Sequence, residues 1–250
     1  MESYLQGEHA RVYDRRMAGM DRDDTAFYRD RAVAADGPVL ELACGTGRIY
    51  LELLAAGVDA DGVDVAGPAL SVLRETATER GLEPSVWQGD MRTLSVDREY
   101  DLVTCPFNAL QHMTTIEDLA ATFEAVHDAL APGGRFVFDV FVPSFELICS
   151  EYGEWTTETV TYRGTPHEFR ERATVVDEVE QRIRVENELR TDEGETVFAV
   201  EHDLSMLPKR TVELLAAASP FEEWTATSGF DDEPLSDGDT VQVWTLERDE

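Results

Sequence analysis

The sequence predicts a doubly wound α/β fold, in which helices flank an open and mostly parallel sheet. Three observations predict it: short apolar runs alternate with helical patterns before residue 150, a glycine-rich turn follows the first run, and strand patterns alone fill residues 154–207. With 250 residues, 42% of them hydrophobic, the chain can bury one full core. We therefore expect one α/β domain with an elaboration, or with a small second domain.

Short apolar runs bounded by turns predict the strands of the first half. These strands are Val39–Leu42, Ala60–Val65, Ser85–Gln88, Tyr100–Cys105 and Arg135–Val142. The helices between them are expected at Ile49–Ala56, from Pro68 to Gly81, and from Thr114 to Leu130. Thr114-x-x-Glu117 has the form of a capping box, and Pro132-Gly133-Gly134 ends the last helix. Residues 1–36, polar with scattered aromatics, predict two short helices ahead of the sheet.

The pattern changes after residue 150, because β-branched residues there alternate with charged ones. The expected strands are Glu154–Tyr162, Glu168–Val176, Gln181–Arg190 and Thr196–Leu207. Such alternation predicts an antiparallel meander with one face in water. Pro208–Ala218 predicts a helix, and Phe221–Gly229 and Thr240–Arg248 predict two final strands with a solvated acidic loop, 231–234, between them.

The net charge of −31 comes from 52 acidic against 21 basic residues, and Lys209 is the only lysine. Such a surface repels nucleic acid at low salt. A carboxylate-rich surface also stays hydrated in high salt, where its self-repulsion is screened. The composition resembles that of haloarchaeal proteins, so we expect a halophilic archaeal origin. On that interpretation the charge says little about the substrate.

The three cysteines, Cys44, Cys105 and Cys149, include no C-x-x-C pair, which favours a reducing cytoplasm over a disulfide framework. The N-terminal stretch lacks the apolar core of a signal peptide. The most apolar stretch, Phe136–Val142, carries Asp139 and is too short to span a bilayer. We therefore expect a soluble cytoplasmic protein without membrane contact or a metal site. The oligomeric state stays open.

The segment VLELACGTGRIY, residues 39–50, runs from the first expected strand through a glycine-rich turn into a helix. Gly45 and Gly47 let backbone approach a ligand closely, because no Cβ intervenes. In a dinucleotide-binding loop a third small residue packs under the pyrophosphate, but Tyr50 stands at that position and argues against pyrophosphate. A tight turn without a ligand is the alternative for this motif taken alone.

Two acids follow the next two expected strands. Asp64 lies 17 positions after Gly47, close to the spacing of an acid that accepts hydrogen bonds from ribose hydroxyls, although it also suits a helix N-cap. Asp90 stands in Gln88-Gly89-Asp90-Met91, where a carboxylate can accept from an exocyclic amine or simply occupy a turn.

Together these motifs resemble the class I S-adenosylmethionine-dependent methyltransferases (EC 2.1.1.-) of the small-molecule type. The resemblance covers about residues 36–145 in order and register. It rests on five motifs: Glu41-Leu42-Ala43-Cys44-Gly45-Thr46-Gly47, Asp64 within GVDVAGPAL, Gln88-Gly89-Asp90-Met91, Phe107-Asn108-Ala109-Leu110-Gln111-His112, and Pro132-Gly133-Gly134. Ala43 replaces the commoner glycine, and Ala66-Gly67-Pro68 stands where S-P is usual.

The resemblance implies a Rossmann-like seven-stranded sheet of order 3-2-1-4-5-7-6 with the last strand antiparallel, and an antiparallel β insertion after strand five. It implies that S-adenosyl-L-methionine is the cofactor. Its methionine portion would lie on the glycine loop, braced by Glu41, with the ribose on Asp64, the adenine amine on Asp90 and the ring against Met91. The expected cofactor-binding set is Glu41, Ala43, Cys44, Gly45, Gly47, Asp64, Val65, Asp90, Met91, Phe107 and Tyr13.

The resemblance also divides the chain into four parts. Residues 1–36 would form a helical cap with Tyr13-Asp14 over the cofactor, 37–150 the cofactor-binding core, 151–207 a lid or substrate wall, and 208–250 the end of the core sheet. Aromatic and basic residues of the insertion are candidates for the pocket, although an aromatic in a strand is more often core; they are Trp155, Tyr162, His167, Phe169 and Arg170.

The segment after the fourth strand is expected to lie beside the methyl acceptor. Its candidates to orient the substrate are Asn108, Gln111 and His112. His112 is the candidate general base, although it could also cap the following helix or lie on the surface. Methyl transfer depends mainly on alignment, which alone can lower the barrier by about 7–11 kcal/mol, so a base is optional. Cys105 could be a nucleophile, but packing at the end of a buried strand is the more common role.

The sequence thus predicts methyl transfer to a small-molecule acceptor by in-line displacement, with a nitrogen or an oxygen as the nucleophile. The alternatives are an RNA or protein methyltransferase, a nicotinamide-dependent oxidoreductase, and a binding domain without activity. The missing third glycine speaks against the oxidoreductase, and the lack of a basic patch speaks against RNA.

Overall fold

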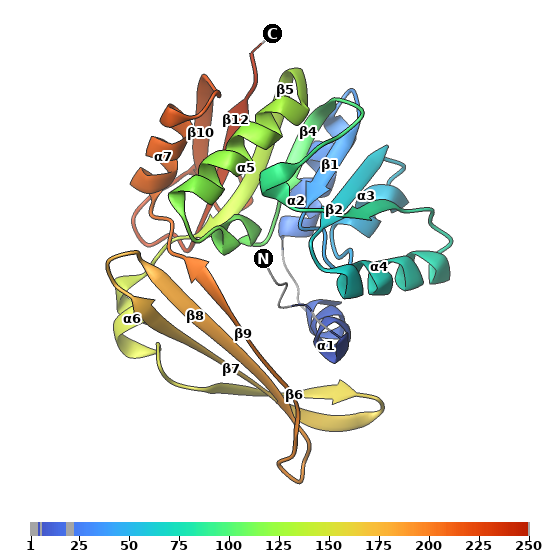
Figure 1. Cartoon of the computed structure of the whole chain (residues 1–250), viewed down its shortest axis with the longest axis vertical. Helices are drawn as coiled ribbons and strands as arrows, with labels where there is room; N and C mark the ends of the chain where they lie inside the picture. The colour runs from blue at the N-terminus through green and yellow to red at the C-terminus, as the bar shows by residue number, and fades with distance from the viewer. Residues whose placement is uncertain (1–4, 6, 19–22, 250) are drawn as a thin grey trace.

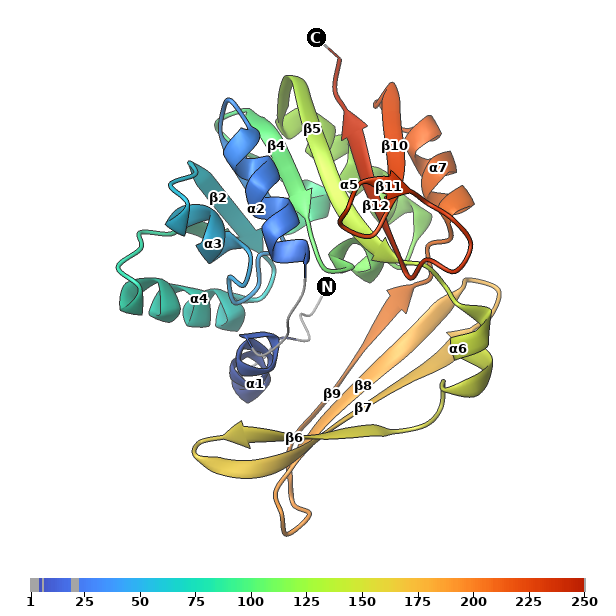
Figure 2. The same cartoon turned by 180° about the vertical axis from the view of Figure 1, so that it is seen from behind.

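The computed structural model describes residue 5, residues 7–18 and residues 23–249. Its larger part is a sheet of eight strands with helices on both faces, and its smaller part is an antiparallel sheet that extends away from the larger one (Figures 1 and 2). The expected α/β fold with a central parallel sheet and an antiparallel strand is confirmed.

The large sheet has the order β11-β10-β12-β5-β4-β1-β2-β3. Its strands are β1 (Val39–Leu42), β2 (Ala60–Asp64), β3 (Ser85–Gln88), β4 (Tyr100–Cys105), β5 (Leu130–Phe141), β10 (Glu223–Ser228), β11 (Glu233–Pro234) and β12 (Val241–Glu247). The first five are parallel to one another, and β12 is antiparallel to both neighbours. The expected count of seven is wrong, because Glu233–Pro234 in the acidic loop pairs with the end of β10.

Each face of this sheet has its own hydrophobic core. On one face lie α2 (Asp24–Ala34), α3 (Tyr50–Ala55) and α4 (Gly67–Glu79), in front in Figure 2. On the other lie α5 (Ile116–Ala129) and α7 (Lys209–Ala218), in front in Figure 1. Their apolar stripes repeat at the helical period, so one side of each helix reaches the sheet.

Several boundaries differ from the sequence expectation by one to five residues, and two of them have a clear physical reason. Thr115 rather than Thr114 is the N-cap of α5, because its hydroxyl accepts from the backbone N–H of Asp118 at 3.1 Å. β5 begins at Leu130 rather than Arg135, and its pairing with β4 is irregular there, so Pro132-Gly133-Gly134 lies inside the strand. A short helix that the sequence did not indicate, α6 (Phe145–Ser150), leads from β5 into the second sheet.

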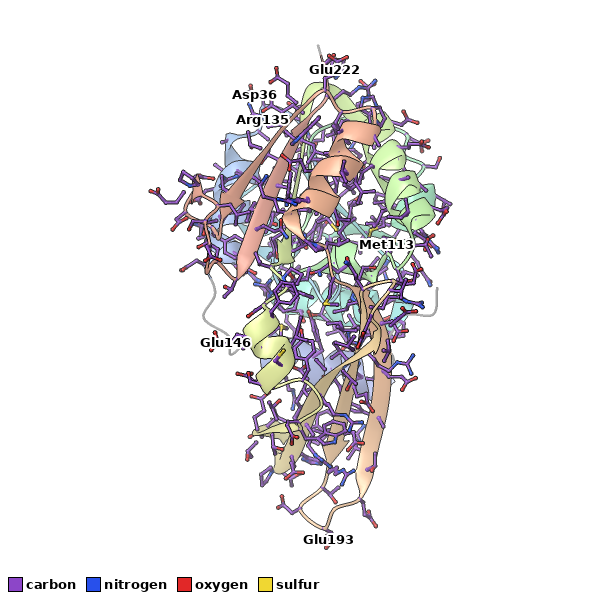
Figure 3. All side chains as sticks on the ribbon, turned by 90° about the vertical axis from the view of Figure 1, so that its left-hand side faces the viewer. Asp36, Met113, Arg135, Glu146, Glu193 and Glu222 are labelled. Carbon is purple, nitrogen blue, oxygen red and sulfur yellow. The ribbon has the colours of Figure 1, made fainter. Side chains whose placement is uncertain are left out.

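The second sheet consists of β6 (Thr156–Tyr162), β7 (Thr165–Asp177), β8 (Arg182–Arg190) and β9 (Thr196–Ser205), paired antiparallel in that order. Figure 3 shows Glu193 at its far tip and Met113 near its junction with the core. Cross-strand ion pairs cover one face, among them Arg172–Glu186 and Arg184–Asp203. The expected wet face is therefore present.

α1 (Gly7–Ala18) lies between α4 and the antiparallel sheet and contacts both (Figure 1). Ala10 packs with residues of α4, while Val12 packs with Tyr162 and Phe169 of the antiparallel sheet. No helix in the described part of the chain is both long and apolar enough to cross a membrane.

Candidate functional site

A cavity of about 400 Å³ opens at the carboxyl ends of β1, β2 and β4, where open α/β sheets bind ligands. α1 contributes Tyr13 to its wall, and β8 and β9 contribute residues from the opposite side. Eleven of the fourteen residues predicted for the cofactor and for the acceptor segment line it: Tyr13, Glu41, Ala43, Cys44, Gly45, Asp64, Val65, Asp90, Met91, Phe107 and His112. Gly47, Asn108 and Gln111 are not among the lining residues.

The glycine loop has three residues with left-handed backbone, Ala43 (φ 51°), Gly45 (φ 56°) and Gly47 (φ 92°). The first is strained, because an alanine Cβ disfavours this conformation, and this explains why glycine is commoner there. A Cβ on Gly47 would lie 2.8 Å from Leu73 and 2.9 Å from Leu51. Gly47 therefore allows the close packing of α3 and α4 beside the loop, and its expected contact with the cofactor stays a prediction.

Tyr50 does not occupy the ligand side of the loop. It is fully buried, and its hydroxyl lies 2.9 Å from the carbonyl oxygen of Ala60 and accepts from the backbone N–H of Ser85 at 2.9 Å. The phenol thus joins β2 to the start of β3 beneath the loop. A bulky third position is tolerated because the side chain points into the core.

Asp64 holds the glycine loop as well as facing the cavity. One carboxylate oxygen accepts from the backbone N–H of Gly45 at 2.8 Å, and the other accepts from that of Ala66 at 2.6 Å. Burial raises the pKa of Asp64, and these two hydrogen bonds oppose the rise. The acid therefore fixes the loop at the point where the cavity begins.

Glu41 lies beneath the loop and is 3% exposed. Burial raises its pKa to about 8, although Arg48 and a backbone hydrogen bond from Tyr50 lower it. Glu41 is among the residues that line the cavity, and its buried Oε2 has no hydrogen-bond partner in the described structure. An unsatisfied buried carboxyl oxygen is costly unless a ligand satisfies it.

Arg48, which the sequence did not single out, also lines the cavity. Its guanidinium forms a bidentate ion pair with Asp24 of α2, at 2.7 and 2.8 Å, and lies 5.1 Å from the ring centre of Phe107. Asp24 is fully buried. The pair attaches α2 to the glycine loop, and no local sequence signal predicts it.

Asp90 lies at the expected place after β3, but Arg92 already binds it. The guanidinium contacts both carboxylate oxygens at 2.6 to 3.1 Å, and this lowers the pKa of Asp90. Arg92 also reaches Asp118 of α5 at 2.7 Å. Asp90 is therefore ionised and rigidly held beside Met91.

His112 ends the short helix η2 (Ala109–His112) and faces His202 of β9, with ring centres 5.1 Å apart. Burial lowers the pKa of His112 to about 4 and that of His202 to about 3. Both imidazoles are thus neutral at neutral pH. His202 also lines the cavity, although no sequence feature singled it out.

Gln111 is a structural residue. Its amide nitrogen donates to the carbonyl of Ser205 at 2.7 Å, and its oxygen accepts from the backbone N–H of Phe141 at 3.1 Å. It is fully buried and does not line the cavity, so the expectation that it orients substrate is wrong.

The insertion residues proposed for the pocket lie elsewhere as well. Tyr162 and Phe169 pack against α1, and Trp155 stacks with Arg170 on the antiparallel sheet. His167 is likewise absent from the lining.

Cys105 is fully buried, and burial keeps its thiol protonated by raising its pKa. A thiolate is required for nucleophilic attack, so Cys105 packs rather than reacts. No group of three His, Cys, Asp or Glu side chains among the described residues is arranged to hold a metal ion.

Comparison with known proteins points to one chemistry. Residues 39–134 match the family model described as a methyltransferase domain. Over 140 residues the chain is 32% identical to a dTDP-4-amino-2,3,4,6-tetradeoxy-D-glucose N,N-dimethyltransferase of Saccharopolyspora spinosa, which covers 53% of this chain and 54% of that protein. The chain matches only about half the length of the first curated relatives.

Solved structures extend the likeness to the whole fold. An amino pentose methyltransferase from Micromonospora echinaspora, determined with S-adenosylmethionine bound, superposes with a TM-score of 0.71 at 25% identity over 98% of this chain and 99% of that one. An S-adenosylmethionine-dependent methyltransferase from Clostridium acetobutylicum has a TM-score of 0.78 at 19% identity, over 97% and 98%. The second likeness concerns the fold alone.

Proposed function

We propose that this chain is an S-adenosylmethionine-dependent methyltransferase that methylates an amine on a small molecule. The observation that carries the proposal is a single cavity that joins a glycine loop and two acids to a pair of neutral imidazoles. The match of residues 39–134 to a methyltransferase domain supports it.

The cavity suits the cofactor at the positions the resemblance assigns. The unsatisfied Oε2 of Glu41 would accept the methionine ammonium, Asp64 the ribose hydroxyls and Asp90 the adenine amine. Met91 and Phe107 would border the ring. When bound, the cofactor supplies a methyl group already activated on a positively charged sulfur, and the acidic wall favours that charge.

The chain's own residues align the reactants and exclude water. Tyr13 of α1 lines one side of the cavity and residues of β8 and β9 line the other, which favours an oriented encounter. His112 lies at the acceptor end in a neutral state, so its imidazole would accept a hydrogen bond from the N–H of a neutral amine and orient it.

An amine suits this site better than a hydroxyl. A base whose pKa is about 4 cannot take a proton from an aliphatic hydroxyl, nor from an alkylammonium group, which ionises near pH 10 as lysine does. The acceptor must therefore arrive with a free lone pair. A neutral amine does so without any base, and the proton of the methylated product passes to water.

The acceptor carries no diphosphate. Among the described residues, the two arginines that line the cavity are already paired with carboxylates, Arg48 with Asp24 and Arg184 with Asp203. Bidentate recognition of phosphate requires a free guanidinium fork. This separates the chain from the dTDP-sugar relative, whose acceptor is linked to a nucleotide.

A labelled-methyl assay tests the proposal. Calorimetry should show that S-adenosylmethionine binds and that NAD does not, and labelled methyl should pass to simple alkyl and sugar amines in preference to a dTDP-linked amino sugar. Binding of NAD alone would overturn the proposal in favour of an oxidoreductase. Transfer to RNA or protein but to no small amine would overturn the acceptor class.

The surface charge supports a further proposal, a cytoplasm of high salt. With a net charge of −31, screening by salt should relieve self-repulsion in the folded state. The melting temperature should therefore rise from 0.1 M to 2 M KCl. A melting temperature that falls would contradict a halophilic origin.

A further inference from the structure

The loop after β4 has an unfavourable backbone. Phe107 (φ 62°) and Asn108 (φ 59°) are consecutive non-glycine residues in the left-handed region. Side chains disfavour that region, so the surrounding structure must hold both residues in it. Phe107 lines the cavity, and η2 with His112 begins one residue after Asn108.

Asp139 holds this loop from below. It lies on β5, is fully buried, and its Oδ1 accepts from the backbone N–H of Phe107 at 2.8 Å. Its Oδ2 accepts from the backbone N–H of Asn108 at 3.2 Å. The left-handed turn directs two successive N–H groups at one carboxylate, an arrangement that binds anions.

Tyr28 of α2 completes the site, because its hydroxyl donates to Oδ1 of Asp139 at 2.7 Å. The phenol is fully buried. One helical turn earlier, Asp24 binds Arg48 of the glycine loop. Positions i and i+4 share one helix face, so α2 reaches both loops with one side.

Resting on the methyltransferase function proposed above, we propose that Tyr28 and Asp139 are positioning residues. They fix the loop after β4 relative to α2, the helix that also holds the glycine loop in place. The guanidinium of Arg48, 5.1 Å from the ring centre of Phe107, joins the two loops directly. In-line transfer requires this alignment, because a small displacement of either loop separates the reacting atoms.

Tyr28→Phe is the main test, because it removes one hydrogen bond and leaves the ring in place. The turnover number should fall at least fivefold while the Kd of S-adenosylmethionine changes less than twofold. Exchange of the backbone amides of Phe107 and Asn108, followed by NMR, should quicken at least tenfold, and that of Val103 in β4 should not change. Asp139→Asn should lower turnover further, since an amide cannot accept from both N–H groups.

Tyr100→Phe is the matched control. Tyr100 is also a buried phenol that donates to a carboxylate, Asp61 at 2.8 Å, but neither residue lines the cavity. Its loss should affect stability without lowering turnover. Equal turnover in Tyr28→Phe, Tyr100→Phe and the unaltered protein would overturn the proposal.

The two proposals fail in different ways. If the unaltered protein neither binds S-adenosylmethionine nor transfers methyl, the proposed function is wrong, and amide exchange in Tyr28→Phe still decides the role of this contact. Unchanged exchange at Phe107 and Asn108 would overturn the positioning role. If Asp139→Asn does not fold, the comparison of Tyr28→Phe with Tyr100→Phe carries the test.

Discussion

Glu41 yields the sharpest prediction, because its charge must change when the cofactor binds. Burial raises the pKa of this carboxyl from its usual 4.5 to about 8. At pH 7 a group with that pKa is about 90% protonated. A ligand ammonium at Oε2 would favour the carboxylate and lower the pKa. Binding at pH 7 should therefore release about 0.9 of a proton.

The same group sets how stability depends on pH without the cofactor. Because its pKa is raised in the folded state, its contribution is fully present below pH 4.5 and is lost as pH rises through 8. At about 1.36 kcal/mol for each pKa unit, the loss amounts to about 4–5 kcal/mol. Glu41→Gln should remove this dependence, so the variant should be more stable than the unaltered protein at pH 8.5.

Calorimetric titration with S-adenosylmethionine in phosphate and in Tris measures the released proton, because the two buffers differ in ionisation enthalpy. Glu41→Gln is the control, and its binding should be weak and independent of the buffer. Denaturant unfolding between pH 5 and 9 measures the stability change. Binding that takes up protons, or that exchanges none, would refute the assignment of the ammonium to Glu41.

Three further variants test the site. Ala43→Gly should relieve the left-handed backbone strain, which costs about 1–2 kcal/mol, while the greater entropy of the unfolded glycine chain offsets about 0.4–1 kcal/mol of the gain. The melting temperature should therefore rise by about 2–4 °C. No rise would show that the strain is absent. Asp64→Ala removes the acceptor of the Gly45 N–H and should weaken cofactor binding about 100-fold, whereas unaltered affinity would mean that the ribose lies elsewhere. His112→Ala should lower turnover about 100-fold at unchanged cofactor affinity, and normal turnover would exclude it as a residue that orients the acceptor.

Local patterns predicted much of the fold and the cofactor end of the site. The glycine loop and the acids after β2 and β3 could be located because strand ends and turn residues are short-range features. The errors in the predicted element boundaries were small; for example, Thr115 rather than Thr114 caps α5. The packing role of Gly47 was not anticipated, because a sequence does not show which side of a turn meets a neighbouring helix.

The role of Asp139 is one that local sequence patterns do not reveal. The sequence marked it only as a charge that rules out a membrane span, although an acid within a buried strand is itself a signal of a bound donor. The groups that donate to Asp139 are distant in the sequence. Asn108 lies more than thirty positions before it, and Tyr28 more than a hundred. Neither spacing follows from any period of helix or strand.

The sequence by itself determined the α/β class, the glycine loop and the two acids beside it, because periodicity and turn chemistry act within a few residues. Only the tertiary structure decided the acceptor end. His112 meets His202, and Gln111 holds Ser205, through contacts that join a core loop to a strand some ninety residues later. Alternation along β9 shows which residues share a face, but chain packing decides what that face meets.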